Sequence, residues 1–351
     1  MQREALRVPE GSWRYRAMIG VGGIGSGVFF ALDGNATLGR EESRGGRFLD
    51  RRDYCKLHII SHYVQALLGS PFSTIPIGQV GDDEQGRRLL GEMAAAGLET
   101  RYVRVVPGVP TLYSFCFLYP DGTGGNMTTD DSASSRVDAA QVESAEREFA
   151  AHAGHGVALA VPEVPLEARE AILKLGTRHG FFRVASFTAG ELSRESTRSL
   201  AGYADLLALN RDEAAAFGGA PSAAASPTAA IEAAVRLAVG RHPTLMLTIT
   251  AGAAGSWLWD GSDLDHLPAL PVAVANTAGA GDAHVSGIIA GLAAGLDAAM
   301  AHQLAVLTAA YSVTSPHTIS PGLDRPALWA LARSAGMTLS PEVRQLLEND
   351  R

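Results

Sequence analysis

Asn276-Thr277-Ala278-Gly279-Ala280-Gly281-Asp282 brings small residues and an acidic residue to the start of an apolar-periodic run. The apolar side chains within 285–292 recur at helical spacing, which predicts that a helix begins here. A helix N-terminus presents unpaired N–H groups and a partial positive charge, and residues 279–281 have almost no side chain to keep a phosphate away from them. Asp282 adds a carboxylate that can remove a proton from an attacking hydroxyl. The stretch predicts phosphoryl transfer, although a glycine loop that only leads into a helix has the same spacing.

The same stretch resembles the second signature of the PfkB (ribokinase-like) carbohydrate kinases, which is written D-T-x-G-A-G-D. Six of its seven positions match, and Asn276 stands in place of the first Asp. The resemblance implies that Asp282 is the catalytic base. It also implies that Thr277 contacts the nucleotide and that the anion hole for the transferring phosphate consists of Ala278, Gly279, Ala280 and Gly281.

Length and composition indicate a globular protein with a substantial core: 351 residues, of which 46% are hydrophobic and 19% charged. The net charge of −8 disfavours nucleic acid and anionic membranes as main partners. Two cysteines, Cys55 and Cys116, fit a reduced intracellular protein better than a disulfide scaffold. No secretory signal or run of about 18 apolar residues is evident, so we expect a cytoplasmic location.

Strands and helices alternate along most of the chain. Strands are expected at 17–23, 28–32, 73–80, 100–106, 112–119, 156–161, 181–187, 205–209, 244–250, 255–259 and 264–274. Helices are expected at 54–68, 83–96, 138–151, 166–179, 192–201, 228–240, 282–295 and 297–313, with a helical tail after Pro326. The alternation predicts an α/β fold with a central, mostly parallel sheet covered on both faces. The resemblance implies the same architecture, a ribokinase-like three-layer sandwich.

Two segments, 27–50 and 108–130, do not fit this alternation, and the Gly-rich stretch up to Asp53 is expected to be irregular. Both segments suit a small β lid over the carboxyl edge of the sheet, where open α/β sheets bind ligands. PfkB kinases carry such a lid, and in many of them it forms a dimer contact, so a homodimer through the lid is implied. We expect residues 1–351 to form a single kinase domain with this lid.

Two further elements resemble family motifs in order and spacing. Gly78-Gln79-Val80-Gly81-Asp82-Asp83-Glu84-Gln85-Gly86 resembles G-x-V-G-D-D-x-x-G, and we interpret Asp82 or Asp83 as the cap of the following helix. Asn210-Arg211-Asp212-Glu213 resembles N-x-x-E, which implies that Glu213 organises Mg²⁺ through water. The same four residues have the spacing of a helix capping box, and both interpretations can hold together.

A third element, Thr250-Ala251-Gly252-Ala253-Ala254-Gly255-Ser256, resembles the T-x-G-x-x-G turn whose backbone lines the nucleotide site. By itself a Gly-rich hairpin is common. Together these elements imply ATP and Mg²⁺ as cofactors, with nucleotide contacts from Asn210, Thr250, Gly252 and Gly255.

The acceptor half of the site departs from the family pattern. Gly27 stands where the family usually has an Asp after the first strand. Residues 53–62 replace the G-G-x-x-x-N segment, and Ser186-Phe187-Thr188 replaces D-P-N. These differences put ordinary ribose or fructose recognition in doubt and leave the phosphate machinery intact.

Lys56 and His58 are candidate cations for an acceptor that carries a phosphate or carboxylate. The alternative is that Lys56 is a solvated helix residue and His58 a packed or exposed one. His58 and His62 have the i,i+4 spacing of a metal pair, but HIISH lacks the glutamate of HExxH, which disfavours zinc. The candidate acceptor site therefore comprises Gly23, Gly27, Lys56 and His58.

Other enzyme classes fit less well. Gly20-Val21-Gly22-Gly23-Ile24-Gly25 satisfies GxGxxG, but no helical stripe follows it, as a dinucleotide site requires. The chain has no Gly-Lys pair for a P-loop, and neither HRD nor DFG. The sequence thus predicts an ATP-dependent kinase that phosphorylates a hydroxyl of a sugar-like molecule. An inactive sugar- or nucleoside-binding regulator on the same fold is the alternative, because Asn276 removes a charge beside the phosphates.

Overall fold

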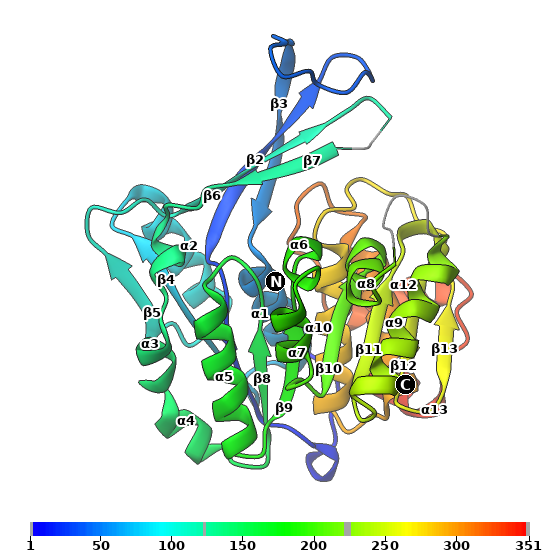
Figure 1. The fold of residues 1–351 in the computed structure, drawn as a ribbon. Helices are drawn as coiled ribbons and strands as arrows, with labels where there is room; N and C mark the ends of the chain where they lie inside the picture. The colour runs from blue at the N-terminus through cyan, green and yellow to red at the C-terminus, as the bar shows by residue number, and fades with distance from the viewer. Residues whose placement is uncertain (1–2, 122–123, 221–225, 349–351) are drawn as a thin grey trace.

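The computed structural model describes residues 3–121, 124–220 and 226–348. Its centre is a nine-stranded sheet with the order β13-β12-β11-β10-β9-β8-β1-β4-β5 (Figure 1). Neighbouring strands from β5 to β11 are parallel, whereas β12 and β13 are antiparallel at one edge. The strands are β1 Ala17–Val21, β4 Ser73–Gly81, β5 Tyr102–Val106, β8 Gly156–Ala160, β9 Phe182–Ser186, β10 Leu206–Asn210, β11 Met246–Thr250, β12 Ser256–Trp259 and β13 Leu264–Leu267. The mostly parallel sheet expected from the sequence is confirmed.

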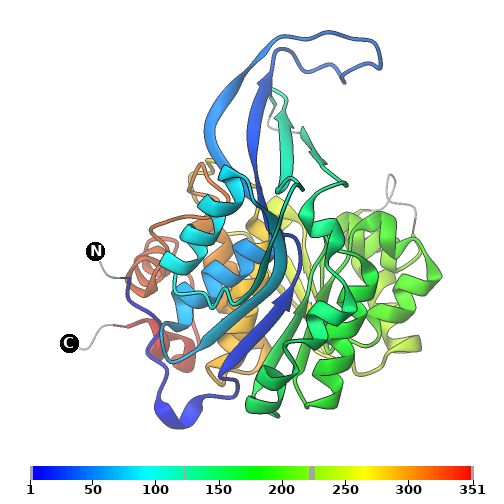
Figure 2. The same cartoon turned by 90° about the vertical axis from the view of Figure 1, so that its left-hand side faces the viewer.

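Helices cover both faces of this sheet, as the side view in Figure 2 shows. One layer contains α1 Lys56–Leu68, α2 Glu84–Ala95, α10 Ala280–Ala293, α11 Ala298–Ser312, α12 Arg325–Ser334 and α13 Pro341–Leu347. The other contains α3 Ala139–Glu143, α4 Glu146–Ala151, α5 Leu166–Arg178, α6 Ala189–Leu192, α7 Glu195–Ala201, α8 Arg211–Phe217 and α9 Pro227–Arg241. Short 3₁₀ helices lie at Glu10–Ser12, Ala133–Arg136 and Gly252–Ala254.

Side chains of the central strands alternate between the two layers. On β10, Leu206 and Ala208 join one buried cluster, while Leu207 and Leu209 join the other. Because successive strand side chains point to opposite faces, an all-apolar strand buried on both sides is the expected pattern for a parallel sheet. The three-layer sandwich follows from this pattern.

A second, four-stranded sheet projects from the body beyond the carboxyl ends of the parallel strands (Figures 1 and 2). Its order is β3-β2-β6-β7, with β2 antiparallel to β3 and parallel to β6. The strands are β2 Gly25–Leu32, β3 Gly46–Tyr54, β6 Leu112–Leu118 and β7 Gly124–Thr128. This sheet is the lid, and the two expected segments contribute two strands each; residues 122–123 lie outside the described chain.

Several expected boundaries are wrong. The stretch up to Asp53 is not irregular throughout, because β3 forms there by pairing with β2. The helix expected at 138–151 is two helices, since Ser144 at their junction bonds back to the carbonyl of Gln141 at 2.6 Å and competes with helix continuation. The strand expected at 264–274 ends at Leu267, where Pro268 supplies no N–H for a ladder.

Cys55 and Cys116 are buried and unbridged. Across the described ranges, no helix combines the length and apolar character needed to cross a membrane.

Candidate active site

A cavity of about 660 Å³ lies at the carboxyl ends of β10 and β11, beside the start of α10. It brings together side chains and backbone from stretches that are far apart in the sequence. Its walls include Lys56, Asn210, Glu213, Thr250, Gly252, Gly255, Thr277, Gly279, Ala280, Gly281 and Asp282. The residues predicted to contact the nucleotide, to hold the metal and to act as the base therefore line the same cavity, and Lys56 lines it as well.

The loop before α10 is shaped by Asn276 and Gly279. Gly279, which precedes the first helical residue, has φ of +77°, a left-handed conformation that favours glycine. Asn276 accepts a hydrogen bond from the Ala278 N–H at 3.1 Å, and its own amide donates to the Pro316 carbonyl at 3.1 Å. An Asp has no N–H to make the second contact, so the departure from the family pattern at this position has a structural role.

Some loop N–H groups already have partners within the protein. Ala278 donates to Asn276, and Ala280 donates to the Thr277 carbonyl at 3.3 Å. Within the described chain, no protein acceptor contacts the N–H groups of Gly279, Gly281 and Asp282. These three amides at the positive end of α10 are free to bind an anion.

Asp282 forms an ion pair inside this cavity. Its Oδ1 lies 3.2 Å from Nζ of Lys56, the first residue of α1, and the Asp282 residue is 9% exposed. The negative charge of Asp282 is the main cause that raises the pKa of the Lys56 ammonium, although burial lowers it. Lys56 is thus a cation held beside the proposed base.

Asn210 and Glu213 form the capping box that their spacing predicts. The Asn210 side chain accepts from the N–H of Glu213 at 2.9 Å, and Oε2 of Glu213 accepts from the Asn210 N–H at 2.8 Å. Glu213 is 8% exposed, and burial raises its pKa while the charge of Lys56 opposes the rise. Its carboxylate is a wall of the cavity as well as a cap.

The donor set suits a metal ion that keeps water and phosphate ligands. In residues 3–121, 124–220 and 226–348, no cluster of three or more His, Cys, Asp or Glu could hold a metal ion by itself. Mg²⁺ commonly takes one or two protein carboxylates and completes its shell with water and substrate phosphates. A single carboxylate at Glu213 is compatible with that arrangement.

Apolar side chains form another part of the cavity wall. They include Leu270, Val272, Val306, Ala310 and Val313. Apolar walls with a few placed polar groups are typical of sites that bind small molecules.

Gly23 lies against Glu163, a residue that the sequence analysis did not select. A Cβ on Gly23 would lie 2.4 Å from Cβ of Glu163 and 2.6 Å from its Oε2, so no side chain fits there. Glu163 has φ of +73°, which is unusual and strained for a residue with a side chain, and its buried Oε2 has no hydrogen-bond partner. Burial raises the pKa of Glu163 to about 7. Strained acidic residues of this kind are typical of functional sites.

His58 and Lys56 both lie on α1, but they border different cavities. His58 is 1% exposed and borders a second cavity with Tyr54 and His62, where burial lowers the pKa of His58 to about 3. The first cavity's walls do not include His58, Gly23, Gly27 or Ala278. The structure therefore brings Lys56, but not His58, into the cavity that contains Asp282.

The glycines at 20–25 do not form a dinucleotide site. β1 ends at Val21, and a second strand, β2, begins at Gly25. A helix is required at that point for the GxGxxG fingerprint, so its rejection is confirmed.

Solved structures with a similar architecture identify the fold. Ribokinase from Giardia lamblia superposes with a TM-score of 0.75 at 16% identity, covering 90% of this chain and 99% of that one. Ribokinase from Arabidopsis thaliana, complexed with ribose and ATP, gives 0.68 at 18% identity, with coverage of 90% and 98%. A nucleoside kinase from Burkholderia thailandensis in complex with inosine gives 0.69 at 18% identity, with coverage of 91% and 98%. The fold is ribokinase-like.

Sequence comparison then places the chain within this class. The model of the pfkB family carbohydrate kinases matches residues 63–325, and the chain belongs to that family. A Klebsiella pneumoniae protein named fructokinase is 29% identical over 226 residues, which cover 62% of this chain and 70% of that protein. Together these relationships support a sugar kinase.

Proposed function

We propose that this protein transfers the γ-phosphoryl group of ATP to a hydroxyl of a sugar or sugar-like acceptor. The observation that carries the proposal is the meeting of Asp282 with the free N–H groups of Gly279 and Gly281 at one end of the cavity. Phosphoryl transfer needs alignment and charge stabilisation more than covalent chemistry, and this arrangement offers both.

Asp282 is the proposed general base. It accepts the proton of the acceptor hydroxyl while the oxygen attacks the γ-phosphorus, and the bond to the β-phosphate oxygen breaks to release ADP. The 278–281 loop is the proposed anion hole, with Gly279 and Gly281 as its donating amides. Lys56 orients the Asp282 carboxylate and adds positive charge where the transferring group becomes more anionic.

The nucleotide is proposed to lie along Asn210, Thr250, Gly252, Gly255 and Thr277, with its base against the apolar walls. Two solved relatives are described as complexes with ATP or with ADP, which supports this assignment. Mg²⁺ bound with the nucleotide would be held by Glu213 through water, where it neutralises phosphate charge. Glu213 itself, fixed by its bond to the Asn210 N–H, keeps its position without the ion.

The lid is proposed to exclude water from the acceptor and to form a homodimer contact. Phe30, Phe48 and Phe115 cluster on one face of this sheet, with ring centroids 5.1–6.4 Å apart. Phe48 is 65% exposed and Met127 57% exposed, so the face has apolar area available for a second copy. We propose that body and lid form one domain.

ADP release from ATP and Mg²⁺, measured over neutral sugars, sugar phosphates, sugar acids and nucleosides, tests this function. Acceptor-dependent release that Asp282→Asn abolishes is the expected result. Thermal stabilisation by a sugar or nucleoside, with no ADP release for any compound, would instead favour an inactive regulator.

A further inference from the structure

Thr318 lies between the lid and the loop that precedes α10, and it is 1% exposed. A Cβ built on Gly279 would lie 3.1 Å from Cβ of Thr318 and 3.2 Å from its carbonyl oxygen, so Thr318 packs directly against Gly279. The same carbonyl oxygen accepts a hydrogen bond from the hydroxyl of Tyr63 on α1 at 3.1 Å. Because Gly279 carries one of the N–H groups proposed to bind phosphate, Thr318 is a direct neighbour of the proposed anion hole.

The other side of Thr318 is bonded to the end of the lid strand β3. The Thr318 N–H donates to the Arg52 carbonyl at 3.1 Å, and its Oγ1 accepts from the Tyr54 N–H at 3.0 Å. The Arg52 N–H donates to Nδ1 of His317 at 3.0 Å. Backbone groups of residues two apart in a strand point the same way, so one edge of β3 is held against residues 317–318.

The segment that contains Thr318 also supports the far end of the anion-hole loop. Nδ2 of Asn276 donates to the Pro316 carbonyl at 3.1 Å, and the N–H groups of Ala275 and Asn276 donate to the Val313 carbonyl at 2.8 and 3.2 Å. The loop is thus bonded to residues 313–318 at its start and packed against them at Gly279. A displacement of this segment therefore carries the Gly279 N–H with it.

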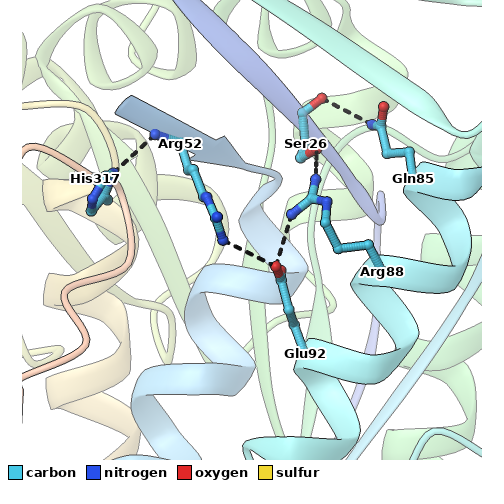
Figure 3. Close-up of polar contacts among 6 residues, drawn as sticks. All are labelled: Ser26, Arg52, Gln85, Arg88, Glu92 and His317. Carbon is cyan, nitrogen blue, oxygen red and sulfur yellow. Dashed lines mark hydrogen bonds and ion pairs between the residues drawn. The ribbon is translucent and has the colours of Figure 1, made fainter. Parts of the chain in front are cut away.

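The end of β3 is anchored on its other side to α2, as Figure 3 shows. The Arg52 guanidinium donates to Glu92 at 3.3 Å, and Arg88, one turn earlier on α2, donates to the same carboxylate at 2.8 Å. Arg88 also donates to Oγ of Ser26 on β2 at 2.6 Å, and Gln85 donates to the Ser26 carbonyl at 3.2 Å. The base of the lid is therefore held between α2 and the 317–318 segment.

We propose that Thr318 is a positioning residue that couples the lid to the anion hole. Phosphate bound by the Gly279 N–H holds Thr318 in place, and Thr318 in turn holds the end of β3 and thereby the lid. In the other direction, the position of β3 sets where the Gly279 N–H points. This inference rests on the proposed nucleotide site.

The coupling has a thermodynamic requirement. The nucleotide can shift the lid only if it binds more tightly to one lid position than to another. A molecule under the lid that favours the same position and the nucleotide then strengthen each other's binding by one common factor. The coupling can therefore be measured with the nucleotide alone, without knowing the acceptor.

The Thr318 hydroxyl is the part of this connection that a substitution can remove. The N–H and carbonyl contacts of Thr318 use backbone groups that a new side chain leaves in place, whereas Oγ1 accepts from the Tyr54 N–H. Val has the shape of Thr without Oγ1, so Thr318→Val deprives that N–H of its acceptor and keeps the packing against Gly279. Thr318→Ser keeps the hydroxyl.

Amide hydrogen exchange of the whole chain, with and without Mg²⁺ and the non-hydrolysable ATP analogue AMP-PNP, tests the coupling. In wild type, AMP-PNP should slow exchange by about fivefold or more both at residues 250–256 of the proposed nucleotide site and at residues 46–54 of β3. In Thr318→Val, it should slow exchange at 250–256 as in wild type but alter exchange at 46–54 by less than about twofold. Thr318→Ser should respond as wild type does.

Thr308→Val is the matched control. Thr308 is fully buried, and its hydroxyl donates to the Leu304 carbonyl at 2.8 Å within α11, so this variant also loses one hydrogen bond of a buried hydroxyl. It should keep the wild-type response of residues 46–54. If Thr318→Val does not fold, Thr318→Ala replaces it, because it also lacks Oγ1.

The possible results separate the coupling from the nucleotide site. Slower exchange at 250–256 with no change at 46–54 in wild type overturns the coupling and leaves the nucleotide site standing. An equal response of 46–54 in wild type and Thr318→Val overturns the role of Thr318. If AMP-PNP changes nothing at 250–256 in wild type, the nucleotide site is wrong and the coupling falls with it.

Discussion

Nζ of Lys56 and Oδ1 of Asp282 lie 3.2 Å apart, although the two residues are 226 positions apart in the chain. The contact joins the first residue of α1 to the first turn of α10. It holds the Lys56 ammonium beside the proposed base and at the amides that we propose to bind phosphate. The N-termini of α1 and α10 therefore form this end of the site together.

Replacing Lys56 by Met should lower kcat by about a hundredfold, the usual effect of losing one charged contact to a transition state. Lys174→Met is the control, because Lys174 is the only other lysine in the sequence. It pairs with Glu170 on the surface of α5, where the side chains of Lys174 and Glu170 are 58% and 44% exposed. Steady-state kinetics with ATP and the best acceptor decide the matter. Equal kcat for both variants would remove Lys56 from the mechanism.

Glu213→Gln separates the metal role from the capping role. Gln can keep the bond to the Asn210 N–H, so thermal stability should change little. The Mg²⁺ concentration for half-maximal activity should rise about tenfold, as for other groups that position a metal. Glu213→Ala should show the same Mg²⁺ effect and also lose about 1 kcal/mol of stability with the cap. If Glu213→Gln keeps the wild-type dependence of activity on Mg²⁺, Glu213 has no metal role and serves only as a helix cap.

Glu163 should make the free energy of unfolding depend on pH. Its pKa is about 7 in the folded protein against an ordinary 4.5, so between these values the folded state holds more protons than the unfolded state. The contribution of Glu163 to the free energy of unfolding therefore falls as pH rises from about 4.5 to about 7, and it stays constant above about pH 7. The full shift corresponds to at most about 3 kcal/mol, and partial exposure reduces it. Denaturant titrations of Glu163→Gln and wild type at pH 5 and pH 8 should diverge at the higher pH; parallel pH dependence would refute the shift.

The lid proposal predicts a dimer that a single charge can break. Phe48→Glu should give a monomer in sedimentation experiments, because it places a charge at the centre of the exposed aromatic face. Val239→Glu is the control, since Val239 is a comparably exposed apolar residue on α9, at 53%. A wild-type monomer at high micromolar concentration would rule out the lid as a dimer contact.

Local patterns in the sequence were sufficient for the core of the fold. Apolar runs such as 206–209, followed by capped helices, predict a buried parallel sheet, because this pattern is visible in neighbouring residues of the sequence. The candidate site residues 277–282 and 210–213 can be selected from the sequence because they lie at helix starts, where short-range hydrogen bonding restricts the residue types.

The acceptor side depends on contacts that a linear pattern does not contain. β3 forms only because β2 supplies its partner, so the stretch with Asp53 looked irregular. Glu163 gave no signal because a left-handed backbone at a non-glycine residue is imposed by tertiary packing.

The most direct test of the central claim follows phosphate itself. Phosphorus NMR of ATP, Mg²⁺ and the best acceptor should show a new phosphate monoester and ADP with wild type. With Asp282→Asn, the rate should fall about a thousandfold while ATP affinity stays within a few-fold. An Asp282→Asn protein that keeps more than about a tenth of the wild-type rate would contradict the account.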